Sequence, residues 1–96
     1  MRYVISYDIS NNAIRRRIDK VLQDYGQRVQ KSVFECNLTS PRIESLITLL
    51  EAERRRRGTA PTDSIRIYPL CVDCSRKAIV LGHHPPIATE SAYVVI

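Results

Sequence analysis

Apolar and polar positions alternate with a period of two in the first segment of the chain. In residues 2–8, Tyr3, Ile5 and Tyr7 fall on one face while more polar residues fall on the other. This spacing predicts a β-strand. Asp8 stands at its C-terminal end, where side chains emerge from a sheet into the following loop.

The period then changes to that of an amphipathic helix. Ser10, Asn11 and Asn12 are all suitable N-cap residues, and Gly26 is a typical helix stop. Between them the apolar positions follow a helical stripe, namely Ile14, Ile18, Val21, Leu22 and Tyr25. Arg15 and Arg17 are expected on opposite flanks of this stripe, with Arg16 pointing outward.

Alternation returns in residues 27–38, which we interpret as one long strand. Its phase shifts, because Val29 and Val33 share one face whereas Phe34 and Cys36 share the other. The shift indicates either a bulge or burial of both faces in the second half of the strand. Ser40-Pro41 then opens a second helix that continues through the arginine run 54–57 to Gly58.

The last third of the sequence predicts two more strands of the main domain. Residues 64–70 form one, and Pro69 places that end of it at an edge or terminus. Residues 71–74 are expected to form a tight turn before a strand over 77–81. Residues 83–86 are a stiff linker, and 91–96 resemble a strand without a neighbour of its own.

This order, β-α-β-α-β-β, predicts an α+β fold of the ferredoxin-like type over residues 1–82. Two crossover connections give a four-stranded antiparallel sheet with two helices on one face. The other face is left bare, so we expect a homodimer packed through the sheets. In the tail, 83–96, the terminal strand is expected to add to the partner's sheet edge.

Charge adds a candidate partner to this picture. Lys and Arg number 15 against 10 acids, which gives a net charge of +5. That balance favours a polyanion such as RNA or double-stranded DNA, contacted by Arg15, Arg16, Arg17 and Arg28. The run Arg54, Arg55, Arg56 and Arg57 either serves solubility at a helix end or, on a basic dimer, extends this nucleic-acid-binding surface. No apolar run approaches the length of a membrane span, and no secretory pattern is present, which predicts a cytoplasmic protein.

Asp8 has two interpretations from the residues alone. It can be a strand-end aspartate that caps the next loop, or it can be a Mg²⁺ ligand. One carboxylate makes a poor Mg²⁺ site, but a two-fold dimer could bring two Asp8 residues to one ion. The ion would then polarise a phosphodiester and activate water.

The cysteines offer a weaker metal candidate. Three cysteines, an odd number, fit a reducing compartment better than a disulfide scaffold. Cys71 and Cys74 have the spacing of half a zinc site, with Cys36, His83 and His84 as candidate further ligands. Reduced thiols in a turn are the simpler interpretation.

Three stretches together closely resemble the small CRISPR-associated adaptation protein family, Cas-two. They are Tyr3-Val-Ile-Ser-Tyr-Asp-Ile-Ser10, Tyr25-Gly-Gln-Arg-Val-Gln-Lys-Ser-Val-Phe-Glu-Cys36 and Ser64-Ile-Arg-Ile-Tyr-Pro-Leu-Cys71, joined by the helix that carries Arg15 and Arg17. The resemblance covers residues 2–82. It implies a ferredoxin-like homodimer with Mg²⁺-dependent endonuclease activity on RNA or DNA, present in some members of the family.

The resemblance also implies a role as the dimeric core of the spacer-acquisition complex, bridging copies of the adaptation integrase, Cas-one. The metal aspartate of the family falls on Asp8. Its catalytically implicated neighbours fall on Tyr7, Arg15, Arg17, Arg28 and Phe34. Two alternatives stay open: a toxin-type ribonuclease on the same fold, and a purely architectural DNA-binding adaptor in which Asp8 is dispensable.

Overall fold

The computed structural model describes residues 1–81 of the 96-residue chain. Seven elements follow one another along the chain, namely β1 (Arg2–Asp8), α1 (Asn12–Gln23), β2 (Gln27–Gln30), β3 (Val33–Asn37), α2 (Ser40–Arg54), β4 (Ser64–Leu70) and α3 (Val72–Lys77). The predicted strand 2–8 and the predicted strand 64–70 match the observed elements.

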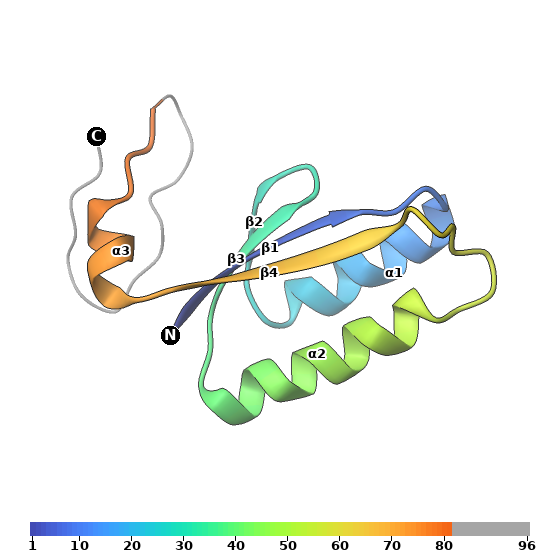
Figure 1. The fold of residues 1–96 in the computed structure, drawn as a ribbon, viewed down its shortest axis with the longest axis horizontal. Coiled ribbons are helices and arrows are strands. Elements are labelled where there is room, and N and C mark those ends of the chain that lie inside the picture. Colours follow the sequence, from blue (N-terminus) through green and yellow to red (C-terminus); the bar gives the residue numbers. More distant parts are fainter. Residues whose placement is uncertain (82–96) are drawn as a thin grey trace.

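The four strands form one antiparallel sheet in the order β2-β3-β1-β4. Both long helices lie on the same side of it (Figure 1). The space between sheet and helices is filled by side chains without solvent exposure, among them Ile5 of β1, Ile18 and Leu22 of α1, Phe34 of β3 and Leu46 of α2. These features confirm the predicted α+β, ferredoxin-like class, and β4 is an edge strand as Pro69 indicated.

The predicted single strand 27–38 is wrong, because this segment is a hairpin. The chain turns at Lys31 and Ser32, so that β2 pairs back onto β3 with Arg28 opposite Phe34. The register shifts between Arg28 and Gln30, so Val29 is an extra residue in β2, as in a β-bulge. The phase change in the sequence therefore records a reversal of chain direction together with a bulge.

The predicted strand 77–81 is also wrong, and with it the element order β-α-β-α-β-β. β2 supplies the fourth strand, so the order is β-α-β-β-α-β followed by α3. The expected turn at 71–74 is the start of α3, which carries Asp73 in its first turn and Arg76 and Lys77 in its last. This charge distribution suits the helix dipole. The tail boundary and the strand predicted at 91–96 lie outside the described residues.

The position of α1 follows from its caps. The Asn11 side chain accepts a hydrogen bond from the amide of Ile14 at 3.0 Å, which begins the helix. After α1, Gly26 passes directly against β3: a Cβ atom there would lie 2.3 Å from the carbonyl oxygen of Glu35. Only glycine permits this approach, which brings β2 beside β3 and sets the hairpin against β1.

Candidate nucleic-acid interface and metal site

Asp8 is exposed at the C-terminal end of β1, opposite Ser64 of the edge strand β4. The loop after it is held by a second carboxylate, Asp63. Asp63 accepts hydrogen bonds from the amide of Ser10 at 3.0 Å and from the amide of Ala60 at 2.9 Å. These bonds, the one from Ala60 first, lower the pKa of Asp63. Asp8 therefore stands at an anchored corner where two loops meet.

One copy of the chain does not make a metal centre at this corner. Within residues 1–81, no group of three or more His, Cys, Asp or Glu side chains is placed to hold an ion. Asp8 supplies a single carboxylate, and Mg²⁺ needs several oxygen ligands. The same finding corrects the idea that Cys36 joins Cys71 and Cys74 around zinc. His83 and His84 lie outside the described residues.

Asp19 of α1, which the sequence analysis did not single out, lies at the centre of three of the predicted site residues. The hydroxyl of Tyr7 donates a hydrogen bond to Asp19 of α1, and the guanidinium of Arg28 pairs with the other carboxylate oxygen of Asp19 at 3.0 Å. The Arg28 guanidinium lies 5.0 Å from the centre of the Phe34 ring, and the Tyr7 and Phe34 rings are 6.4 Å apart. We call Tyr7, Asp19, Arg28 and Phe34 the Asp19 cluster.

Solvent exposure increases across the Asp19 cluster from its aromatic rings to its arginine. Phe34 is fully buried and Tyr7 is 3% exposed, whereas the side chain of Arg28 is 38% exposed. The cation over the aromatic face and the ion pair hold the guanidinium in one place. The signal for Asp19 in the sequence was its position directly after Ile18, on the flank of the apolar stripe.

The arginines of α1 have different surroundings. Arg15 reaches back to the loop after β1, where it donates a hydrogen bond to the carbonyl oxygen of Ile9 at 3.2 Å and another to the Asn12 side chain. Arg16 is exposed. Arg17 forms a two-pronged ion pair with Glu53 of α2, with nitrogen–oxygen distances of 2.8 and 3.3 Å. Of the three, Arg15 is therefore the one held beside the Asp8 corner.

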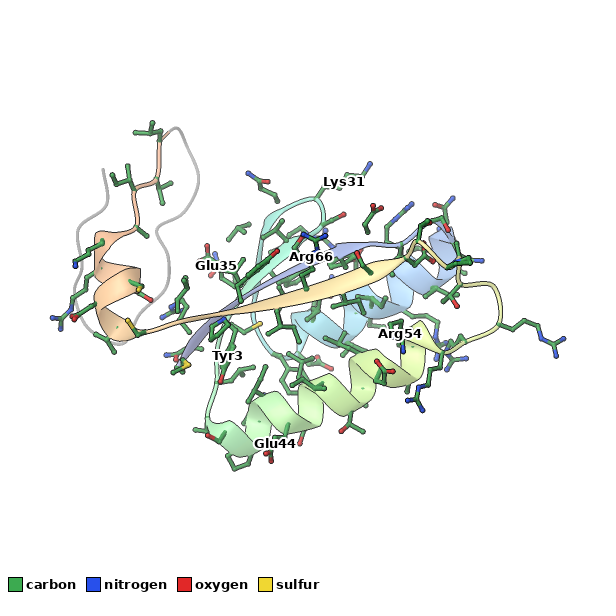
Figure 2. The ribbon with its side chains drawn as sticks, viewed as in Figure 1. Tyr3, Lys31, Glu35, Glu44, Arg54 and Arg66 are labelled. Atoms are coloured by element: carbon green, nitrogen blue, oxygen red, sulfur yellow. The ribbon has the colours of Figure 1, made fainter. Side chains whose placement is uncertain are left out.

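The arginine run at the end of α2 is largely paired with glutamates (Figure 2 labels Arg54 there). Glu51 accepts from Arg54 and from Arg55, and Glu53 accepts from Arg56 at 2.7 Å as well as from Arg17. The hydrogen bond from Arg54, supported by the one from Arg55, lowers the pKa of Glu51 to about 2, although desolvation acts in the opposite direction. Within residues 1–81, Arg57 makes no ion pair. We call Glu51, Glu53 and Arg54–Arg57 the α2 arginine cluster.

Fold and site together define a small ferredoxin-like domain with an exposed aspartate at the end of its first strand and an arginine-bearing helix directly after it. The sequence matches the family described as CRISPR associated protein Cas2 over residues 1–78. The chain belongs to this family. None of the helices in the described part is long and apolar enough to cross a membrane.

Individual relatives agree with the family match. The chain is 41% identical to the CRISPR-associated endoribonuclease Cas2 1 of Chloroflexus aurantiacus over the full length of both proteins. It superposes on the crystal structure of Streptococcus pyogenes Cas2 with a TM-score of 0.70 and 33% identity, covering 85% of this chain and all of that one. A chain of a partial Cas6-RT-Cas1–Cas2 complex matches with a TM-score of 0.63 and 25% identity, covering 99% and 98%.

Proposed function

We propose that this protein is a cytoplasmic CRISPR adaptation protein that acts as the dimeric core of a spacer-acquisition complex. The observation that carries the proposal is the match to a chain from an assembly that contains Cas1 and Cas2, which spans 99% of this protein. A Cas1-type integrase is therefore the proposed protein partner. A second copy of the chain would cover the sheet face that the helices leave open.

The proposed nucleic-acid surface consists of the arginines that are exposed or held near the Asp8 corner. These are Arg15 and Arg16 on α1 and Arg28 on the hairpin, with Arg57 beyond α2, which makes no ion pair within the described part of the chain. Arginine is suited to phosphate because its planar group donates several hydrogen bonds at once. Arg17 and Arg54–Arg56 are already paired with glutamate. In this proposal they do not contact phosphate directly but add to the positive potential around the surface.

A second proposed activity is metal-dependent phosphodiester hydrolysis, and it depends on the dimer. The relative from Chloroflexus aurantiacus is named an endoribonuclease, and Asp8 is exposed at a strand end. In this proposal two Asp8 carboxylates, one from each copy, hold a Mg²⁺ ion, which would supply charge stabilisation and an activated water. Arg15 would bind phosphate beside it. Arg28, held by Asp19 and Phe34 on the helix side of the sheet, would bind phosphate further along the nucleic acid, with Tyr7 helping to fix Asp19.

The two activities separate when spacer acquisition and nuclease activity are assayed in parallel on Asp8→Ala. We expect nuclease activity to fall by about two orders of magnitude or more, since removal of the metal ligand removes the activated water. Acquisition should persist if the protein is an architectural core. Asp8→Asn keeps the shape of the side chain and should behave the same way.

Two controls make the assay decisive. Sedimentation of Asp8→Ala shows whether it is still a dimer, since a loss of acquisition in a dissociated protein would say nothing about Asp8 itself. Charge reversal at Arg16, an exposed residue outside the Asp19 cluster, should weaken acquisition and make nucleic-acid binding less dependent on salt, because one phosphate contact fewer releases fewer counterions. Acquisition that depends on Asp8 but not on Arg16 would contradict the adaptor proposal.

A further inference from the structure

Two exposed cysteines lie side by side where β4 passes into α3, far from the Asp8 corner. Cys71 is the N-cap of α3, and its sulfur accepts a hydrogen bond from the amide of Cys74 at 3.3 Å. Cys74 is the third residue of that helix. Side chains at the N-cap and at this third position face one another, as they do in a capping box, so the backbone brings the two thiols together.

The third cysteine provides an internal contrast. Cys36 is buried on β3 with 1% exposure, and burial raises the pKa of its thiol to about 11. Hydrogen bonds from Cys74, the backbone one first, lower the pKa of Cys71, while the side-chain bond with Cys71 raises the pKa of Cys74. The two thiols therefore differ, since ionisation is favoured at Cys71 and disfavoured at Cys74. A reactive cysteine next to a resolving cysteine is typical of a redox site.

We propose that Cys71 and Cys74 form a reversible dithiol–disulfide site whose substrates are small disulfides of the glutathione type. The site rests on the geometry of this turn and is independent of the proposed function in spacer acquisition. It also replaces the zinc interpretation of this motif for the described part of the chain.

The exchange takes place in two steps. The Cys71 thiolate attacks one sulfur of oxidised glutathione, whose sulfur–sulfur bond breaks and releases one glutathione thiolate. Cys74 then loses its proton and attacks the Cys71 sulfur, which forms the protein disulfide and releases the second glutathione. The two protons of the protein thiols end on the two glutathione molecules, so one protein disulfide forms as one glutathione disulfide is reduced.

The disulfide closes a loop of four residues across the first turn of α3. In Figure 1, α3 lies beyond the end of β4, away from α1 and α2. The oxidised form should therefore stabilise this first turn while the Asp8 corner and the Asp19 cluster stay unchanged. Amide hydrogen exchange within α3 should slow by about threefold or more on oxidation, since the cross-link restricts local opening.

Oxidation by glutathione disulfide, followed by tryptic mapping, tests the proposal on the full chain. Cleavage after Arg66 and Arg76 releases residues 67–76, which carry both cysteines, and cleavage after Lys31 and Arg42 releases residues 32–42, which carry Cys36. We expect peptide 67–76 to lose the mass of two hydrogen atoms without gaining glutathione. Cys36 should react more slowly by on the order of tenfold or more.

Single variants identify the roles of the two thiols. Cys74→Ser should accumulate one glutathione on Cys71, because the resolving thiol is gone, and Cys71→Ser should react more slowly than Cys74→Ser. A wild-type protein that keeps a stable glutathione adduct on peptide 67–76 would overturn the proposal. So would oxidation that yields only cross-linked chains, or a pair that stays reduced while Cys74→Ser is modified in the same buffer.

Discussion

The Asp19 cluster and the α2 arginine cluster both combine arginine with acid, but they use the pairing in opposite ways. In the Asp19 cluster one carboxylate holds one arginine, Arg28, whose group also lies over the Phe34 ring and remains partly exposed. At the end of α2, two glutamates take up four arginines, Arg17 and Arg54–Arg56. The first arrangement orients a cation towards solvent, whereas the second offsets part of the charge of a cationic run and engages its guanidinium groups in ion pairs.

The difference shows that counting arginines overestimates the charge available to a ligand. The run 54–57 is the densest basic stretch of the sequence, yet Arg54, Arg55 and Arg56 are all bonded to glutamates of α2. Arg28 has no basic residue directly beside it in the sequence, and it is held by Asp19, by the Phe34 ring and by the carbonyl oxygen of Lys31. A phosphate contact benefits from a cation whose position is already set, because less side-chain freedom is lost on binding.

The largest expected effect comes from removing the aromatic ring on which the Asp19 cluster rests. Phe34→Ala deletes a fully buried side chain of the core and should lower the free energy of unfolding by about 3 to 5 kcal/mol. Urea denaturation followed by circular dichroism measures the change. Arg28 also loses its cation–π contact, so its nucleic-acid binding should weaken with the fold.

Phe34→Leu is the matched control, because it keeps an apolar side chain in the same space. It should restore most of the lost stability while leaving Arg28 without an aromatic partner. If Phe34→Leu binds nucleic acid as tightly as the unchanged protein, the ring does not position Arg28 for binding.

A smaller effect is expected from Asp19→Asn, which keeps the shape of the side chain but removes the charge that holds Arg28. Loss of a charged hydrogen-bond partner should lower stability by about 1 to 2 kcal/mol. Asp24→Asn removes the same charge from the exposed C-cap of the same helix, so it corrects for the change in net charge. Nucleic-acid affinity, measured by fluorescence anisotropy, should be lower for Asp19→Asn than for Asp24→Asn.

Much of the fold could be predicted because hydrophobic period is a local signal. The strands 2–8 and 64–70 and the buried stripe of α1 followed directly from spacing. The hairpin did not, because the turn at Lys31 and Ser32 contains no Gly, Pro, Asn or Asp, and the reversal is seen in the antiparallel pairing of β2 with β3. The α3 segment was missed because residues 71–74 were expected to form a turn and residues 77–81 a strand, whereas its cap and terminal charges favour a short helix.

The candidate site could be predicted only in part, because most of its contacts are not local in sequence. Residues such as Tyr7, Arg28 and Phe34 could be named from the resemblance, but their contacts join elements far apart in the chain. Asp19 and Glu53 were missed because an acid on a helix flank usually faces water. What distinguishes them is the arginine that the tertiary fold places opposite, and sequence spacing carries no information about that.

The smallest expected effect concerns the α2 arginine cluster and appears as a dependence of stability on pH. The hydrogen bond from Arg17 is the main cause that lowers the pKa of Glu53. The pKa of Glu53 is lower in the folded than in the unfolded protein. The ion pair therefore stabilises the fold fully at pH values above the pKa of glutamate in the unfolded chain, which is about 4.3. This stabilisation is lost as the pH falls through the folded pKa.

Glu53→Gln removes the charge and serves as the reference at every pH. Glu53 is buried but Arg17 is half exposed, so solvent screens part of the interaction and the difference in unfolding free energy at pH 7 should be about 1 kcal/mol. The two unfolding curves should converge as the pH falls below 4, since a protonated glutamate and a glutamine are both neutral. Glu51→Gln should show a weaker version, because Glu51 and its partners are more exposed. If the difference in unfolding free energy between the unchanged protein and Glu53→Gln persists in acid, Glu53 acts through packing and not through its charge. The contrast between Asp19, which orients an arginine, and Glu53, which offsets arginine charge, would then fail.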